Sequence, residues 1–362
     1  MAELNNLATI GKWMIYGAYG YTGKLVVEEA VKRGHLPVVA GQNEEKVLDL
    51  AEQYNLPFRV FPLDHPRKIK SHLADVGVVL NCAGPFSQTA KPLREACIDC
   101  GVHYLDITGE IEVLEESYQS HPAAREAGVV VISGVGFDVV PTDMLASLLK
   151  EQLPTATHLE LAFAGGGGIS PGTAKTMLEM VAQRGRIRRD GEMVQVPLAW
   201  RCREVPFSDM PRHCTTIPWG DVSTAFHSTG IPNVMVYTAV EKGQARWMKW
   251  MNPLVGFLAK PAVQAWLRQK ITDKVDGPTK EQRDAGFMRI WGRVSDGQRE
   301  VEMTMDTPEG YNYTVLASLV AVEALLAHKI MPGAYTPSQV LEREAITGME
   351  GVTIEVKTHA EN

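Results

Sequence analysis

Three glycines near the start of the chain have the spacing of a phosphate-binding turn. The apolar segment 13–16 runs into Gly17, Gly20 and Gly23, and a helical stretch over 24–32 follows. A tight turn needs the open backbone angles of glycine at the first position. The second glycine lets the chain approach a pyrophosphate, and the third lets the helix pack on the strand. The helix N-terminus then offers free N–H groups and partial positive charge. This context predicts that a dinucleotide is bound by Gly17, Tyr19, Gly20, Tyr21, Thr22 and Gly23.

Residues at the ends of later apolar segments extend the predicted site. The acidic residue that usually binds the ribose of NAD is expected about 20 residues after the glycines, where this chain has Gln42. No arginine there attracts the 2′-phosphate of NADP. No carboxylate repels it either, however, and for that reason the sequence favours NADP over NAD. Asp64 is placed to border the adenine, or equally to act as a cap or turn residue. The residues expected along the nicotinamide are Asn81, Ala83, Gly84 and Pro85.

Hydride transfer with a nicotinamide also needs a proton donor in a dry cleft. Tyr104 and Asp106 come from a predicted strand over 102–107, and Asp138 comes from the loop after the next strand. Asp138 is the first choice, because that loop is expected to abut the nicotinamide. The structural alternative is that Asp138 caps the helix beginning near Pro141.

The segments that carry these residues follow a regular alternation. Between residues 13 and 133, six apolar segments alternate with helical ones, which predicts a doubly wound parallel sheet. Ligands bind beyond the carboxyl ends of the strands in such sheets. After Pro154, alternating strand-like runs with hairpin spacing predict a second α+β domain built on a mainly antiparallel sheet.

Four segments together resemble successive signatures of the saccharopine dehydrogenase-like oxidoreductases. They are 17–23, 81–86, 103–110 and 136–143. The branch that includes trans-acting enoyl reductases is the most similar, because its Gly-Pro-Ser/Thr motif resembles Gly277-Pro278-Thr279. The resemblance is strong over 10–145, patchy over 160–310, and recognisable again from Gly310.

This resemblance implies a Rossmann domain, a second mixed domain, and oxidation or reduction with a nicotinamide cofactor. It does not imply that saccharopine is the substrate. In the family a late helix returns to the first domain. The expected division is therefore a dinucleotide-binding domain over 1–143, a substrate or dimerisation domain over 144–308, and a returning C-terminal segment over 309–362.

Composition narrows the class of protein. The chain has 362 residues, of which 45% are hydrophobic and 22% charged, as is ordinary for a soluble globular protein with two sizeable cores. The net charge of −7 argues against nucleic acid as a partner. The five cysteines form no disulfide framework and no signal peptide is visible, so we expect a cytoplasmic protein. Cys97 and Cys100 lack a second ligand pair, so no metal site is predicted.

Two segments of the second half allow several interpretations. Residues 246–260 combine tryptophans, methionines and basic residues. Four interpretations are open: helices packed on their own domain, a lid over an apolar substrate, a homodimer contact, or a peripheral membrane contact. The last would extend over 246–270. The second segment is a basic cluster, interpreted as solvated loop charge or as a site for a substrate anion or an acidic carrier protein. It comprises Arg184, Arg186, Arg188, Arg189, Arg201 and Arg203.

These observations favour an NAD(P)-dependent oxidoreductase that transfers hydride to a C=C or C=N bond of an apolar, lipid-like or polyketide-like small molecule. One alternative is a non-catalytic nucleotide-binding scaffold or sensor. Another is an opine-type or amino-acid dehydrogenase, which would need cationic groups to hold amino-acid carboxylates, and only residues 184–203 offer them. A short-chain dehydrogenase is excluded, because the chain contains no Tyr-x-x-x-Lys pair.

Overall fold

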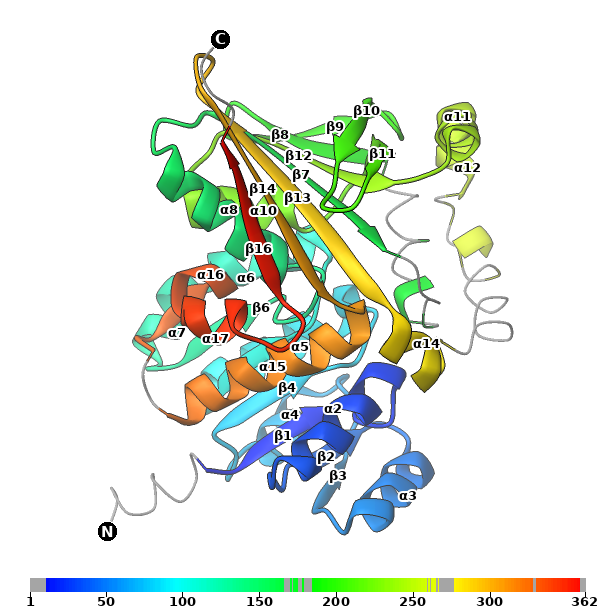
Figure 1. Ribbon diagram of the computed structural model, residues 1–362. Coiled ribbons are helices and arrows are strands. Elements are labelled where there is room, and N and C mark those ends of the chain that lie inside the picture. The colour runs from blue at the N-terminus through cyan, green and yellow to red at the C-terminus, as the bar shows by residue number, and fades with distance from the viewer. Residues whose placement is uncertain are drawn as a thin grey trace. The chain divides into compact units, whose positions relative to one another are not determined.

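The computed structural model describes residues 11–165, 170, 172–174, 178, 184–258, 260, 262–264, 266, 277–327 and 330–358. The chain divides into two compact units, and Figure 1 labels most of their elements. The first unit comprises the described residues of Met1–Thr108, Glu112–Phe137 and Tyr311–Leu341. The second unit comprises those of Gly109–Ile111, Asp138–Gly310 and Glu342–Asn362. Each unit contains one sheet.

The first unit is built on a seven-stranded sheet in the order β15-β6-β5-β4-β1-β2-β3. Every pairing in it is parallel, with Ile15 of β1 between Leu80 of β4 and Val39 of β2. The doubly wound parallel sheet predicted from the sequence is confirmed. Its strands are β1 (Trp13–Tyr16), β2 (Val38–Gly41), β3 (Phe58–Val60), β4 (Val78–Asn81), β5 (His103–Asp106), β6 (Val130–Ser133) and β15 (Gly333–Tyr335).

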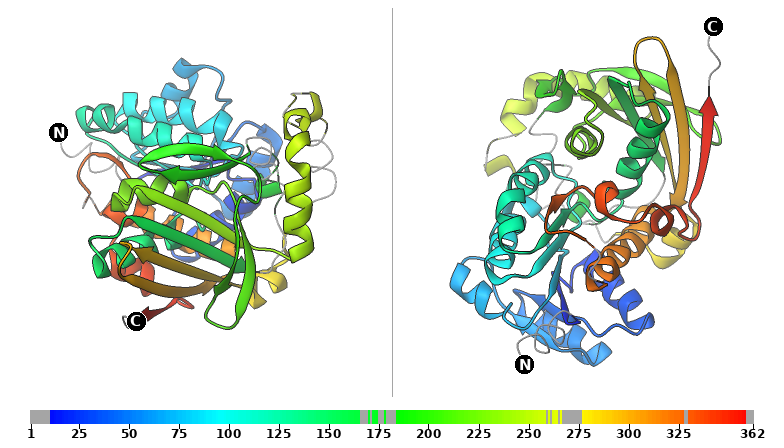
Figure 2. Two further views of the ribbon diagram at one scale, coloured as in Figure 1. Left: turned by 90° about the horizontal axis from the view of Figure 1, so that it is seen from above. Right: turned by 90° about the vertical axis from the view of Figure 1, so that its left-hand side faces the viewer.

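Helices cover this sheet (Figure 1, Figure 2). The central strands are buried along their whole length, as their unbroken apolar runs require. Leu93 and Cys97 of α5 share one core with Met14 and Val79 of the sheet. The helices of the unit are α2 (Tyr21–Lys32), α3 (Glu44–Tyr54), α4 (Pro66–Ser71), α5 (Phe86–Cys100), α6 (Ile111–Gln119), α7 (His121–Glu126), α15 (Gly310–Leu326) and α16 (Pro337–Val340).

The second unit contains a nine-stranded sheet in the order β10-β11-β12-β7-β13-β14-β16, with β8 pairing with β12 and β9. All pairings are antiparallel except β12 with β7, so the mainly antiparallel sheet predicted here is also confirmed. The strands are β7 (His158–Gly165), β8 (Gly185–Arg189), β9 (Glu192–Val196), β10 (Cys202–Pro206), β11 (Pro211–Thr216), β12 (Asn233–Ala239), β13 (Phe287–Ser295), β14 (Glu300–Pro308) and β16 (Thr353–Thr358).

Both faces of the second sheet are packed. Gly292 of β13 faces α8, where an added Cβ would lie 2.6 Å from Leu149 Cδ1. On the other face, Trp291, Tyr237 and Val205 belong to a separate buried cluster. The helices of this unit are α8 (Val140–Gln152), α10 (Asp221–Thr229), α11 (Lys242–Met251), η1 (Asn252–Leu254), α12 (Val255–Leu258), α14 (Lys280–Ala285) and α17 (Arg343–Thr347).

The expected return of 309–362 to the first domain needs correction in its last part. Helix α15 and strand β15 lie in the first unit, but the chain from Glu342 onward belongs to the second. The physical reason is strand β16, which pairs antiparallel with β14, with Ile354 opposite Met305. The boundary near the middle of the chain falls between Phe137 and Asp138 rather than at residue 143.

Candidate functional site

The turn between β1 and α2 requires glycine at two positions for the protein's own packing. Gly17 has φ +80°, and a Cβ there would lie 2.7 Å from the backbone nitrogen of Ala83. The Gly17 N–H donates to the carbonyl of Ala40, at 2.8 Å. A Cβ on Gly23 would lie 2.3 Å from the carbonyl oxygen of Gly17. These two glycines let β1, β2, β4 and the start of α2 come close together.

Gly20 differs from its two neighbours in the motif. It is the N-cap residue of α2 with φ −68° and ψ 167°, an extended conformation that any residue adopts. The nearest protein atom to an added Cβ is the Gly17 carbonyl oxygen, at 3.2 Å. The fold therefore places a weaker demand on Gly20 than on Gly17 or Gly23. A phosphate bound at the N-terminus of α2 would explain a glycine at position 20, because a side chain there would keep the phosphate away from the backbone N–H groups.

The end of β2 is where a dinucleotide's adenine ribose binds in this fold. Three side chains lie there, those of Tyr19, Gln42 and Lys46. The Tyr19 ring packs on Gly41, where an added Cβ would lie 2.4 Å from its Cε1 atom. Gln42 is exposed beside it, and Lys46 Nζ lies 6.0 Å from the Tyr19 ring centroid. Lys46 is not among the residues that the glycine spacing and strand ends predicted. The sequence feature that could have identified Lys46 is its position in the first turn of the helix after β2. Asn43 caps this helix, α3, by accepting the Lys46 backbone N–H at 3.0 Å.

The small residues after β4 are held by one amide side chain. Asn81 Oδ1 accepts the backbone N–H of Ala83 at 3.0 Å. Its Nδ2 donates to Tyr104 Oη at 3.2 Å and to Thr89 Oγ1 at 3.3 Å. This places Ala83 beside Gly17, while Gly84 and Pro85 lead into α5, for which Pro85 is the N-cap residue.

The other predicted cofactor residues lie on the flanks of the turn. Tyr21 and Thr22 form the first turn of α2, and the Tyr21 ring packs edge-on against Tyr311 at a centroid distance of 4.9 Å. Asp64 is exposed after β3, with an oxygen 3.9 Å from His65 Nε2. His65, not Asp64, is the N-cap residue of α4. A role for Asp64 at the adenine stays a prediction.

Two of the three candidate proton donors make structural contacts in the first unit. Asp106 Oδ1 accepts the N–H groups of Thr108 at 3.1 Å and Gly134 at 3.0 Å, and Oδ2 accepts the Ser133 hydroxyl at 2.8 Å. These bonds join the ends of β5 and β6. Tyr104 is fully buried in the core, and burial raises its pKa well above the usual range. A catalytic role for either residue stays a prediction that these contacts do not support.

Asp138, the third candidate, differs from the other two. It is half-buried at the start of the second unit, and burial raises its pKa to about 7. Its backbone carbonyl accepts the indole N–H of Trp219 at 2.9 Å. An added Cβ on Gly109 would lie 2.9 Å from Asp138 Oδ2, so this glycine makes room for the carboxyl group. The N-cap residue of α8 is Val139, and Asp138 does not cap that helix.

The basic cluster is divided between exposed and buried positions, since Arg184, Arg189 and Arg201 are exposed as solvated charge would be, whereas Arg188 is not. Residues 185–189 form strand β8, and Arg188 is buried there. Its Nε donates to the Val222 carbonyl at 2.9 Å, and its guanidinium lies 4.2 Å from the Phe226 ring centroid. Val222 and Phe226 are more than 30 residues from Arg188 in the sequence, so no local pattern could have predicted these contacts.

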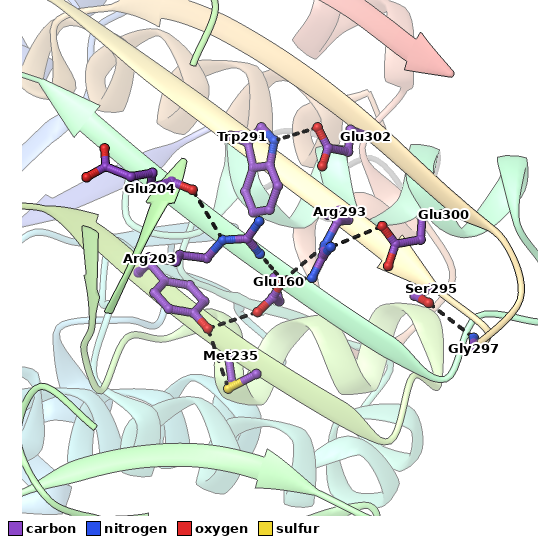
Figure 3. A network of polar contacts seen from close by, with 11 residues as sticks. Glu160, Arg203, Glu204, Met235, Trp291, Arg293, Ser295, Gly297, Glu300 and Glu302 are labelled. Atoms are coloured by element: carbon purple, nitrogen blue, oxygen red, sulfur yellow. Dashed lines mark hydrogen bonds and ion pairs between the residues drawn. The ribbon is translucent and has the colours of Figure 1, made fainter. Parts of the chain in front are cut away.

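Arg203 belongs to a polar network on the second sheet (Figure 3). Glu160 forms ion pairs with Arg203 and with Arg293, whose Nη2 lies 2.6 Å from Oε2, and accepts the Tyr237 hydroxyl at 2.9 Å. Burial alone would raise the pKa of Glu160, but the two guanidinium groups lower it. Arg203 also lies over the Trp291 ring, at 4.7 Å from its centroid. The second unit thus neutralises this arginine internally.

Clustered metal ligands and membrane-spanning helices are both absent from the described part of the chain. Within it, no three or more His, Cys, Asp or Glu side chains gather as metal ligands would. None of the helices described there is long and apolar enough to cross a membrane.

Comparison with known families supports the cofactor site. Residues 13–132 match the family model described as the saccharopine dehydrogenase NADP binding domain. The predicted resemblance and the predicted dinucleotide cofactor are thereby confirmed. The matched segment contains the glycine turn, Tyr19, Lys46 and the Asn81–Ala83 contact, so these candidate residues lie within the recognised domain.

Individual relatives match about half of the chain. A saccharopine dehydrogenase-like oxidoreductase of Bos taurus is 28% identical over 214 residues, which are 51% of this chain and 50% of the relative. A Mycobacterium tuberculosis protein to which trans-acting enoyl reductase activity is ascribed is 28% identical over 185 residues, 47% of this chain and 44% of the relative. The matches thus span about half the length of these curated relatives.

One solved structure shares the fold of almost the whole chain. The apo saccharopine dehydrogenase (L-Glu forming) of Saccharomyces cerevisiae superposes with a TM-score of 0.66 at 13% sequence identity. The alignment covers 96% of this chain and 100% of the yeast chain. At this identity the likeness establishes the fold alone.

Proposed function

We propose that this chain is an NADP(H)-dependent oxidoreductase. The observation that carries the proposal is Gly20, whose backbone any residue could adopt and whose missing side chain leaves the helix N-terminus open to a phosphate. The match of residues 13–132 to an NADP-binding domain supports it independently. When bound, the nicotinamide cofactor supplies or accepts a hydride.

The protein's own residues have separate tasks in this proposal. Gly17, Gly20 and Gly23 form the pyrophosphate cradle, and Asn81 holds Ala83 against it. Lys46 provides a positive charge at the end of β2, which suits the 2′-phosphate of NADP better than the free hydroxyl of NAD. Tyr19 supplies an aromatic surface beside that charge.

Asp138 is the proposed proton donor. A carboxyl group with a pKa of about 7 is protonated in a substantial fraction of molecules near neutral pH, so it can deliver a proton as hydride reaches the substrate. We further propose that the substrate bond is a polarised C=C or C=N in an apolar molecule. The support for this finer statement is the relative with ascribed enoyl reductase activity.

An opine-type dehydrogenase is less favoured. Its substrate carboxylates would need cationic groups from residues 184–203, but Arg188 is bound to the Val222 carbonyl and Arg203 to Glu160. Both guanidinium groups already have partners within the second unit, which leaves the exposed Arg184, Arg189 and Arg201 to hold a substrate carboxylate.

The test is titration of the purified protein with NADPH and with NADH, followed by nucleotide fluorescence. We expect binding by the wild type and a loss of at least a hundredfold in affinity for Gly20→Val, with an unchanged circular dichroism spectrum. Gly11→Val is the matched control, because nothing lies within 4 Å of its added Cβ. If Gly20→Val bound the nucleotide with wild-type affinity, the proposal that Gly17, Gly20 and Gly23 form a pyrophosphate cradle would be wrong. Binding of NADPH without its oxidation by any enoyl or imine compound would favour the nucleotide-binding scaffold.

A further inference from the structure

The helical segment after β12 exposes an unusual stripe of large apolar side chains. Trp247, Trp250, Leu254 and Phe257 are 64%, 81%, 51% and 56% exposed. Their spacing of three, four and three residues places them on one side of a helix. The segment runs through α11, the single turn η1 and α12, which are nearly continuous in sequence. Soluble domains rarely leave such a row uncovered.

The segment is firmly attached to the second unit, so the stripe is held outward. Ala245 and Val255 are its buried residues. The Asn252 side chain forms two hydrogen bonds with the backbone of Leu198. Its Oδ1 accepts the Leu198 N–H at 2.7 Å, and its Nδ2 donates to the Leu198 carbonyl at 3.2 Å. A capping box between Glu241 and Gln244 fixes the start of α11. These contacts account for one side of the segment and leave the tryptophan side uncovered.

A basic row runs beside the stripe. Residues 241–260 contain Lys242, Arg246, Lys249 and Lys260 but only one acidic residue, Glu241, in a chain whose net charge is −7. On a helix, positions 242, 246 and 249 share a side adjacent to that of Trp250. All four basic residues are exposed, and Lys242 Nζ lies 3.6 Å from a carboxylate oxygen of Glu204, so Arg246, Lys249 and Lys260 carry the charge argument. Cationic side chains flanking tryptophans are the composition of helices that lie in the headgroup region of a membrane.

We propose that α11, η1 and α12 form a docking surface for an anionic lipid bilayer, with the apolar stripe inserted among the headgroups and acyl chains. Charge favours this partner over a second copy of the chain. A symmetric contact with the two stripes antiparallel would bring the two basic rows together, whereas anionic lipid complements them. The inference does not depend on the proposed oxidoreductase activity.

The experiment is sedimentation of the full chain with vesicles, accompanied by its tryptophan emission spectrum. We expect the protein to sediment with vesicles of three parts phosphatidylcholine to one part phosphatidylglycerol, with a blue shift, and not with phosphatidylcholine alone. Trp247→Ser with Trp250→Ser should lower the partition coefficient at least tenfold. Arg246→Gln and Lys249→Gln should each lower it about fivefold. Sedimentation should weaken as salt is raised.

The matched control is Leu36→Ser with Met331→Ser. It removes two apolar side chains that are 70% and 77% exposed on the first unit, and it should sediment like the wild type. Circular dichroism and a thermal melt establish that each variant is folded. The proposal fails if neither vesicle binds, or if the double tryptophan variant binds as well as the wild type. It also fails if the stripe instead holds a dimer that the double variant dissociates without any vesicle binding.

Discussion

At the scale of single residues, the glycine motif combines two different requirements. Gly17 and Gly23 are needed because Ala83 and the turn's own backbone occupy the space that a Cβ would fill. At Gly20 the crowding is milder, since an added Cβ would lie 3.2 Å from the Gly17 carbonyl oxygen. The sequence predicted all three as a unit, because the spacing is the same whatever the cause. Only the structure separates the glycines that fold the turn from the one that a phosphate would need.

Lys46 is the residue that the sequence analysis missed, and it leads to a prediction on cofactor choice. Lys46→Ala should weaken NADPH binding about tenfold, the value of one lost charge-assisted contact to a phosphate. NADH affinity should change less than twofold, because NADH has no 2′-phosphate. Calorimetric titration with both nucleotides measures the difference. Lys68→Ala on α4 is the control, and an equal loss for both nucleotides would mean that Lys46 does not read the 2′-phosphate.

At the scale of elements, the sequence predicted the strands that are apolar along their length. It did not predict which residues of neighbouring strands they would contact. The run 76–80 identified β4 because a strand buried on both faces needs no alternation. Helix α2 begins at Tyr21 and not at Lys24, since the extended Gly20 already serves as its N-cap residue. The role of Asp106 depends on Ser133 and Gly134 at the end of the neighbouring strand, a contact that only the sheet order creates.

Asp106 offers a test that separates a structural from a catalytic role. Asp106→Ala leaves two buried N–H groups unpaired and should lower the free energy of unfolding by about 3 kcal/mol. Asp106→Asn keeps an oxygen for both groups and should cost about 1 kcal/mol. Urea denaturation measures both, with the surface change Asp99→Ala as control. Two variants as stable as the wild type but without turnover would instead place Asp106 in the chemistry.

At the scale of the whole molecule, two groups of carboxyls oppose each other as pH changes. Burial raises the pKa values of Asp138, to about 7, and of Asp221, so the folded chain holds more protons than the unfolded chain above pH 4. Stability from these two residues is lost as pH rises. Asp75 and Asp209 have pKa values lowered to about 2 by hydrogen bonds from Lys12 and Arg212. Their stability is present above pH 4 and lost on acidification.

The molecule should therefore be most stable at mildly acidic pH. Between pH 5 and 7 the raised pKa of Asp138 should make the free energy of unfolding decrease with rising pH, by at most about 1.4 kcal/mol per pH unit. The raised pKa of Asp221 adds to this decrease, and the lowered pKa of His72 opposes it. Asp138→Asn cannot ionise, so this decrease should become shallower, whereas Asp49→Asn on the exposed side of α3 should leave it unchanged. Urea denaturation at a series of pH values measures each slope. A slope equal in wild type and Asp138→Asn would mean that Asp138 is already ionised at pH 5, and that it could not supply the proton proposed for hydride transfer.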